Sequence, residues 1–186
     1  MKRKIIIIII LLSYSLFSQK KAGILVGINN SSSSDEILGK FNFTNEISYH
    51  FGAFYEFSIN SNITFRPKLL FSQQGNRTTK DFEHSYHKMD YLNIPLNLKF
   101  FQNTYIIAGP QIGFLLKYED NTFNYTEPHS FDIGINLGIG KKIKDFLLEL
   151  NFYQGIKPSV NRKRSGYNIV KGYNTLIQLS FGYYLF

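Results

Sequence analysis

The chain has 186 residues and a formal net charge of +8 at pH 7, from 21 basic and 13 acidic side chains. Apolar residues make up 44% and charged residues 18%, which excludes a highly charged, disordered chain. The absence of cysteine excludes a disulfide framework, a thiol nucleophile and a thiolate zinc site. Aromatic residues reach 17%, with 18 Phe, 13 Tyr and no Trp, which is more than a soluble core of this size needs.

Residues 1–19 are expected to be a secretory signal peptide. Three basic residues, Lys2–Lys4, precede the unbroken apolar run Ile5–Leu12, which Leu16 and Phe17 extend, and small or polar residues at 15, 18 and 19 suit cleavage. A transmembrane anchor is the alternative, but the apolar stretch is interrupted and shorter than the ~20 residues that a spanning helix needs. Residues 20–186 would then form one domain outside the cytoplasm.

From residue 23 onward, apolar residues alternate with polar or small ones at a period of two, which predicts β-strands. One face of each segment carries large aliphatic and aromatic side chains, such as Ile133, Ile135 and Leu137, and the other face is polar or small. In chain order the eight segments are 23–30, 49–59, 62–73, 88–101, 104–117, 131–141, 145–155 and 173–186.

The connectors between these segments alternate in length. The short ones are 60–61, 102–103 and 142–144, and the long, polar ones are 31–48, 74–87, 118–130 and 156–172. Short turns at one rim and long loops at the other are typical of a transmembrane β-barrel, with its turns in the periplasm. We therefore predict an all-β fold: an eight-stranded antiparallel up-and-down transmembrane β-barrel with its apolar faces toward lipid. The sheet must close because lipid cannot satisfy a free backbone edge, and aromatic girdles would explain the excess of Phe and Tyr.

Three prolines fall inside predicted strands, at Pro67, Pro95 and Pro110. Proline removes a ladder donor, and a closed barrel has no edge strand to accommodate it. We therefore expect β-bulges at these three positions.

Four segments resemble the PorT-like outer-membrane β-barrel proteins of Gram-negative bacteria. They are Tyr91–Phe100, Ala108–Leu116, Phe131–Gly134 with Leu137–Gly140, and Leu176–Tyr183. The resemblance covers roughly Ala22 to Phe186 and implies an outer-membrane location. It also implies that the barrel-assembly machinery recognises a terminal aromatic residue such as Phe186, although the alternation places this residue one position out of phase. The family's namesake belongs to a protein-secretion and gliding apparatus, and most relatives have no assigned activity.

Five charged residues lie on inward phases next to the short turns, and we predict that they form a charge network in the periplasmic half of the lumen. They are Glu56, Arg66, Lys68, Lys99 and Glu149. Glu56 and Arg66 flank the turn at 60–61, so they should be cross-strand neighbours. A charge in a narrow lumen needs a partner, which favours a salt-bridge network that plugs the barrel. The alternative interpretation is a gate that admits ions.

The fourth long loop holds five basic residues and no acid. They are Lys157, Arg162, Lys163, Arg164 and Lys171. Such a cluster could contact lipopolysaccharide phosphates or another external polyanion, and a merely solvated loop is the alternative. Nucleic-acid binding is not expected, because the charges are not interleaved with stacking aromatics.

No enzymatic, cofactor or metal site is predicted. The four histidines, His50, His84, His87 and His129, map to loops or extracellular strand ends, where solvated side chains are the favoured interpretation over a metal site. Phosphate-loop, nucleophile-elbow and zinc-protease motifs are missing.

We therefore expect an integral outer-membrane protein with a structural or interaction role. Its extracellular loops would bind an envelope or external partner, and its surroundings would be outer-membrane lipid and lipopolysaccharide. A narrow channel or a component of a secretion apparatus is the alternative, and a lipid-modifying enzyme is a third, less favoured hypothesis.

Overall fold

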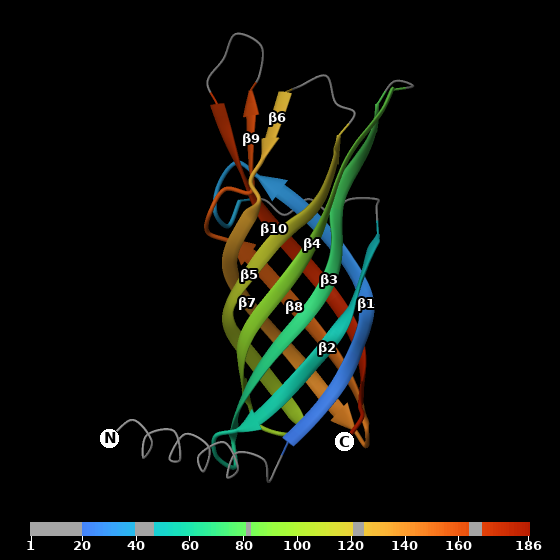
Figure 1. Cartoon of the computed structure of the whole chain (residues 1–186), viewed down its shortest axis with the longest axis vertical. Helices are drawn as coiled ribbons and strands as arrows, with labels where there is room; N and C mark the ends of the chain where they lie inside the picture. The colour runs from blue at the N-terminus through green and yellow to red at the C-terminus, as the bar shows by residue number, and fades with distance from the viewer. Residues whose placement is uncertain (1–19, 40–46, 81–82, 121–124, 164–168) are drawn as a thin grey trace, which may run out of the picture.

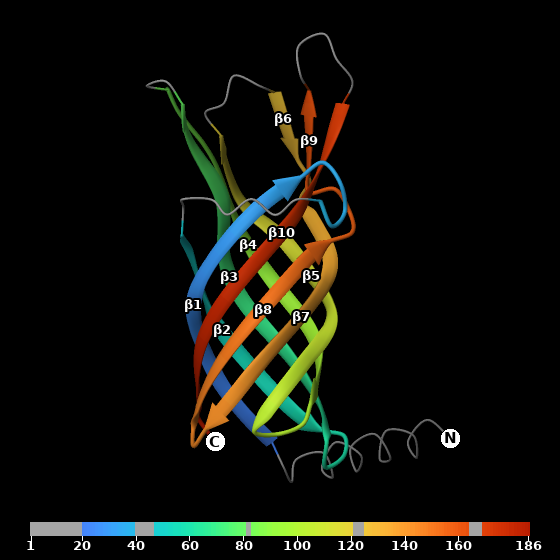
Figure 2. The ribbon, with the colours of Figure 1, turned by 180° about the vertical axis from the view of Figure 1, so that it is seen from behind.

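Eight long strands close into one antiparallel barrel in the computed structural model, which describes residues 20–39, 47–80, 83–120, 125–163 and 169–186 (Figures 1 and 2). The predicted leader, residues 1–19, lies outside the described residues. The barrel strands are β1 (Lys20–Ser34), β2 (Ser48–Ser58), β3 (Ile63–Lys80), β4 (Glu83–Phe100), β5 (Thr104–Asp120), β7 (Phe131–Ile143), β8 (Phe146–Gly155) and β10 (Ile169–Tyr184). Two short strands, β6 (Tyr125–Pro128) and β9 (Val160–Lys163), lie outside the barrel wall.

Pairing of the first and last strands completes the barrel. β1 and β10 are antiparallel from Gly23↔Tyr184 to Ser34↔Tyr173. Beyond this ladder, the Leu185 N–H donates to the Ala22 carbonyl at 2.8 Å. β10 ends at Tyr184, and Leu185 and Phe186 are both exposed, so the alternation stops there and the last residue turns out of phase. The predicted eight-stranded up-and-down fold is confirmed.

Most large apolar side chains of the barrel strands point outward, away from the lumen, and a smaller inward set forms a buried cluster of Leu25, Phe54, Leu70, Leu147 and Tyr184. Ile135 is 49% exposed and Leu179 is 42% exposed, whereas Arg66 and Glu149 on the opposite phase are fully buried. A water-soluble barrel would show the reverse arrangement, because apolar area is stabilised by removal from water. The predicted facing of the strands is therefore right. No helix among the described residues is long and apolar enough to cross a membrane.

The two ends of the barrel differ. We call the end with the short turns the turn rim; it holds the connections at 59–62, 101–103 and 144–145, the start of β1 and the C-terminus (Figure 1). We call the opposite end the loop rim. Strands continue past the barrel wall there, in the hairpin of β3 and β4 and in the strands β6, β9 and β10 (Figure 2).

The expectation of long irregular loops at the loop rim is wrong in three places. Residues 74–87 are mostly a hairpin, paired from Gly75↔Lys88 to Lys80↔Glu83. β6 and β9 lie within the predicted loops 118–130 and 156–172; β6 pairs with β9, and β9 pairs with the start of β10. The period-two pattern that indicates a half-buried strand is absent from these segments, so the sequence did not predict strands there.

The predicted bulges at Pro67, Pro95 and Pro110 are also wrong. Each strand pairing keeps the same offset on both sides of these prolines, because a missing N–H removes one ladder bond without adding a residue. Among the described pairs, the register shifts only between Asp90 and Tyr91 of β4. This point lies just beyond the last β5–β7 pair, where β4 and β5 leave the barrel wall.

Candidate functional site

Five charged side chains fill the lumen next to the turn rim. Glu56 is near the end of β2, Arg66 and Lys68 are near the start of β3, Lys99 is near the end of β4, and Glu149 is near the start of β8. All five lie on inward phases, and none is more than 3% exposed. The short turns at this rim hold these strand ends together, which brings the five residues to one level of the barrel.

These side chains form one continuous chain of ion pairs. Lys68 Nζ donates to Glu149 Oε1, and Arg66 Nη1 lies 2.8 Å from Glu149 Oε2. Arg66 Nε lies 3.5 Å from Glu56 Oε1, and Lys99 Nζ lies 2.9 Å from the same oxygen. Each acid thus lies between two bases, which compensates for the loss of hydration in a narrow lumen. Three basic groups against two acidic ones leave the network with one net positive charge.

Two tyrosines complete the network. Tyr105 O–H donates to Glu149 Oε2 at 3.1 Å, and Tyr184 O–H donates to Glu56 Oε1 at 2.8 Å. Lys99 Nζ also lies 4.8 Å from the Tyr105 ring centroid, close enough for a cation–π interaction. We did not single out these tyrosines from the sequence, although the alternation puts both on the inward phase.

Three glycines of β7 let side chains from neighbouring strands cross the lumen. A Cβ at Gly140 would lie 2.3 Å from Tyr105 Cζ, and one at Gly138 would lie 2.3 Å from Asn151 Oδ1. At Gly134 it would lie 2.6 Å from the Tyr153 ring. We call Gly134, Gly138 and Gly140 the glycine face of β7. The rings of Tyr105 and Tyr153 therefore contact bare backbone, and little open space remains beside them.

His50 belongs to a second polar layer, so its interpretation as a solvated histidine is wrong. It is fully buried, and its Nδ1 lies 2.6 Å from Asn29 Oδ1 and its Nε2 lies 2.8 Å from Ser180 Oγ. Gly27 is its partner on β1, and a Cβ there would lie 2.5 Å from His50 Cε1. β2 begins at Ser48, so His50 is already part of the strand. It lies an even number of residues before Glu56, and its side chain therefore faces the lumen like that of Glu56.

The other histidines lie at the loop rim. His87 is half-buried, with Nδ1 3.7 Å from Asp120 Oδ2, and its ring meets that of Tyr118 edge-on. The His129 N–H donates to the Ser159 carbonyl at 2.8 Å, and the side chain of His84 lies outside the described residues. Within the described ranges, no group of three or more His, Asp or Glu side chains could hold a metal ion.

The basic cluster predicted at the fourth loop is partly described. Lys157 and Lys171 are exposed, and Lys157 Nζ lies 5.2 Å from the Phe131 ring centroid. β9 carries Arg162 and Lys163, whose side chains are outside the description, as is all of Arg164. β6 brings Glu127 opposite Asn161 of β9, so an acid from another loop lies beside the basic strand. A count of charges within one loop could not show this.

A closed barrel with an apolar outer face, a polar lumen and short turns at one rim is the architecture of an integral outer-membrane protein. The sequence model of the outer membrane protein β-barrel domain family matches residues 17–161. The chain belongs to this family and is located in the outer membrane, with the turn rim toward the periplasm and the loop rim outside the cell.

Solved outer-membrane barrels are similar to the chain in fold. The crystal structure of Neisserial surface protein A has a TM-score of 0.52 and 12% sequence identity, over 88% of this chain and 96% of that chain. Ail, the attachment invasion locus protein of Yersinia pestis, solved in complex with the heparin analogue sucrose octasulfate, has a TM-score of 0.46 and 12% identity, over 90% of this chain and 99% of that chain. OprG of Pseudomonas aeruginosa has a TM-score of 0.46 and 10% identity, over 89% of this chain and 94% of that chain. No curated protein matches the sequence significantly.

Proposed function

We propose that the protein is a non-enzymatic interaction protein of the outer membrane. Its extracellular strands bind an envelope or external partner, and its lumen stays closed by the charged network. The observation that carries this proposal is the continuation of β3, β4, β6, β9 and β10 as paired strands beyond the barrel wall. Paired strands hold side chains in fixed positions, so a partner can bind them with a smaller loss of conformational entropy than a mobile loop would require.

The edge of this extracellular sheet is available for a partner. The strand order ends β10-β9-β6, so one edge of β6 has no strand partner among the described residues. Such an edge can add a strand from another protein through main-chain hydrogen bonds. The exposed Lys157 and Lys171, together with the basic residues at 162–164, would attract a negatively charged partner.

Binding of a fluorescent polyanion to intact cells tests this proposal, because only the loop rim is accessible from outside. We expect the double substitution Lys157→Gln/Lys171→Gln to weaken the binding of fluorescent heparin. The matched control is Lys88→Gln/Lys117→Gln, which removes the same charge from β4 and β5 on the same side of the membrane. If both variants lost the same fraction of heparin binding when equal amounts of protein were present at the cell surface, a specific role for the basic cluster would be contradicted.

A narrow channel is the second candidate, and the polar side chains found at successive levels of the lumen favour it. From Glu56 and Arg66 the lining passes through His50 and Asn29 to Gln74, all of them buried. Planar-bilayer recordings separate the two candidates. Resolved conductance steps that Arg66→Ala alters would favour the channel, whereas a silent wild-type protein would favour the closed barrel.

We also infer the finer membership of the PorT-like group from the segments at 91–100 and 108–116. That inference supports a role as a component of a protein-secretion apparatus. Comparing secreted proteins from cells with and without this chain tests such a role. Lipid A mass spectra from the same two strains test the non-enzymatic part of the proposal.

A further inference from the structure

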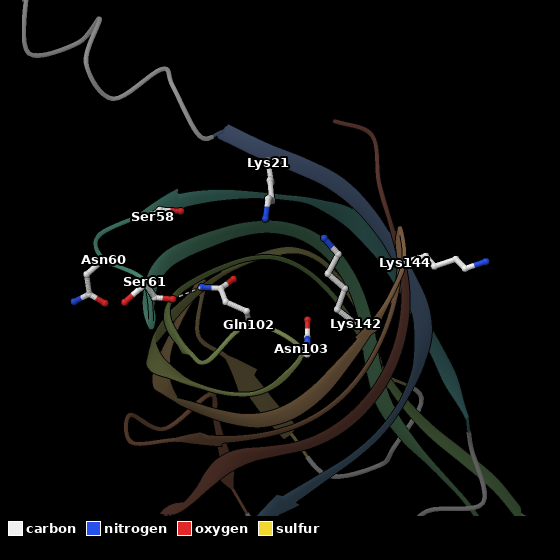
Figure 3. A pocket seen from close by; sticks show the side chains of 8 residues that line it. All are labelled: Lys21, Ser58, Asn60, Ser61, Gln102, Asn103, Lys142 and Lys144. Atoms are coloured by element: carbon white, nitrogen blue, oxygen red, sulfur yellow. Dashed lines mark hydrogen bonds between the residues drawn. The ribbon is translucent and has the colours of Figure 1, made fainter.

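A pocket opens at the turn rim, on the opposite side of the membrane from the extracellular strands. It has a volume of about 380 Å³ and is lined by the start of β1 and by residues of the three short turns (Figure 3). This volume is within the range of small-molecule sites, and the lining is polar throughout. The extracellular role proposed above does not involve this pocket.

Two lysines from opposite ends of the sequence point into the pocket. Lys21 comes from β1 and Lys142 from β7, and their ammonium groups approach one another across the pocket, whereas Lys144 points away (Figure 3). Among the described residues, neither Lys21 nor Lys142 forms an ion pair with a carboxylate. Asp145, in the turn between β7 and β8, is exposed and does not line the pocket. The pocket therefore concentrates positive charge without an internal counter-charge.

Lys142 is held in place by an aromatic ring. Its Nζ lies 4.2 Å from the ring centroid of Tyr184, and the hydroxyl of Tyr184 is bound to Glu56 in the lumen network. This contact orders the long side chain before any ligand arrives, so that binding loses less rotamer entropy. Lys99, the nearest base deeper in the lumen, is already paired with Glu56 at 2.9 Å. Lys21 and Lys142 are thus the cations that this pocket offers to a ligand.

Neutral groups suited to an anion's oxygens surround the two lysines. The hydroxyls of Ser58 and Ser61 and the amides of Gln102 and Asn103 line the remaining wall. Gln102 Nε2 donates to the Ser61 carbonyl at 3.2 Å (Figure 3) and to Thr64 Oγ1 at 3.5 Å, which ties the first two turns together. The neutral donors left for a ligand are therefore the two serine hydroxyls and the Asn103 amide. Ammonium groups and neutral donors together favour phosphate or carboxylate oxygens, because charge-assisted hydrogen bonds are the strong ones.

We propose that the turn-rim pocket binds an oxyanion, a phosphate or carboxylate group carried by a small hydrophilic solute of the periplasm. Lys21 and Lys142 bind the anionic group, and the serine hydroxyls and the Asn103 amide bind the rest of the solute. A solute with several oxyanion groups binds more tightly than inorganic phosphate, because both ammonium groups can then be engaged at once.

Backbone NMR of the purified full chain in an uncharged detergent tests the proposal. Inorganic phosphate, pyrophosphate and citrate are titrated separately, so that the last two distinguish a phosphate from a carboxylate source. We expect saturable shifts of amide signals confined to residues 21–22, 58–62, 102–103 and 142–144, with pyrophosphate or citrate tighter than inorganic phosphate. Raising the salt concentration should weaken the binding, because the contacts are partly exposed.

Two substitutions and one matched control decide whether the pocket is specific. Lys142→Gln and Lys21→Gln should each lower the affinity for the more tightly bound ligand by roughly fivefold, which is the loss expected for one partly exposed charged contact. Lys141→Gln removes the same charge one residue away, where the side chain is exposed and does not line the pocket, and should change the affinity little.

The proposal would be overturned if Lys141→Gln and Lys142→Gln lowered the affinity equally, or if the amide shifts never saturated. Either result would show only a general attraction of anions to a basic rim. Heat-modifiable migration on a detergent gel verifies that each variant is folded. If Lys142→Gln fails to fold, Lys21→Gln against Lys141→Gln decides the question, because Lys21 does not belong to the chain of ion pairs described in the lumen.

Discussion

Replacing Glu149 by Gln should destabilise the barrel more than any other conservative change in the lumen. The carboxylate of Glu149 accepts hydrogen bonds from Arg66 at 2.8 Å, from Lys68, from Tyr105 at 3.1 Å and from Asn151 at 2.8 Å. Gln keeps the volume and one acceptor oxygen but removes the charge, which leaves three basic groups against one acid. Removing one partner of a buried ion pair costs ~3–5 kcal/mol, and we expect the free energy of unfolding to fall by about that amount.

The measurement is urea unfolding in lipid vesicles, followed by far-UV circular dichroism and by gel migration because the chain has no Trp. Glu119→Gln is the matched control: Glu119 pairs with Lys117 at 2.5 Å, but on the exposed surface, so its loss should have little effect. Adding Lys68→Met to Glu149→Gln should restore part of the stability, because it removes the excess positive charge. A Glu149→Gln variant as stable as the wild type would refute the interdependence of the lumen charges.

Three further predictions test the barrel itself. Leu137→Arg, which places a charge in the outward apolar band at the middle of β7, should cost ~2–4 kcal/mol and block assembly, as measured by the yield of heat-modifiable barrel in outer membranes. Gly27→Val should lower the urea midpoint, because the new Cβ would lie 2.1 Å from the Leu179 carbonyl and 2.5 Å from His50; an unchanged midpoint would contradict the close approach. Ile28→Cys/Leu179→Cys should form a disulfide on oxidation, since these residues are partners across the β1–β10 closure, and a persistently free thiol pair would argue against that register.

The facing of the strands was predictable because lipid imposes a simple rule. Ile135, Leu137 and Ile139 alternate with Asn136 and Gly138, and only one facing leaves the apolar set in hydrocarbon once the connectors show two unlike rims. Beyond the bilayer that rule no longer applies. The paired residues between 74 and 87 show no regular alternation of apolar and polar side chains, so nothing in their pattern distinguishes a strand from a loop.

The composition of the lumen network and the contact between Glu56 and Arg66 were predictable, but the pairing across the lumen was not. The alternation of the strands and the short distance in sequence from the turns predicted that Lys68 and Glu149 face the lumen near the turn rim. These two residues lie on β3 and β8, which are not neighbours in the sheet, so their contact could not be predicted. Contacts across a lumen depend on how the sheet closes and staggers, which no single segment encodes. His50 was missed for a related reason: the space that receives it is left by Gly27 on another strand.

The glycine face of β7 makes the barrel wall unequal in thickness. At these three positions β7 presents only main chain to the bore, and the rings of Tyr105 and Tyr153 lie over two of them from β5 and β8. Trimming Tyr153 would therefore widen the space beside β7 and leave all five members of the charge network with their partners, whereas trimming Tyr105 would also remove a hydrogen bond to Glu149. Bore width and interior charge can thus change separately at the Tyr153 end of this face and only together at the Tyr105 end.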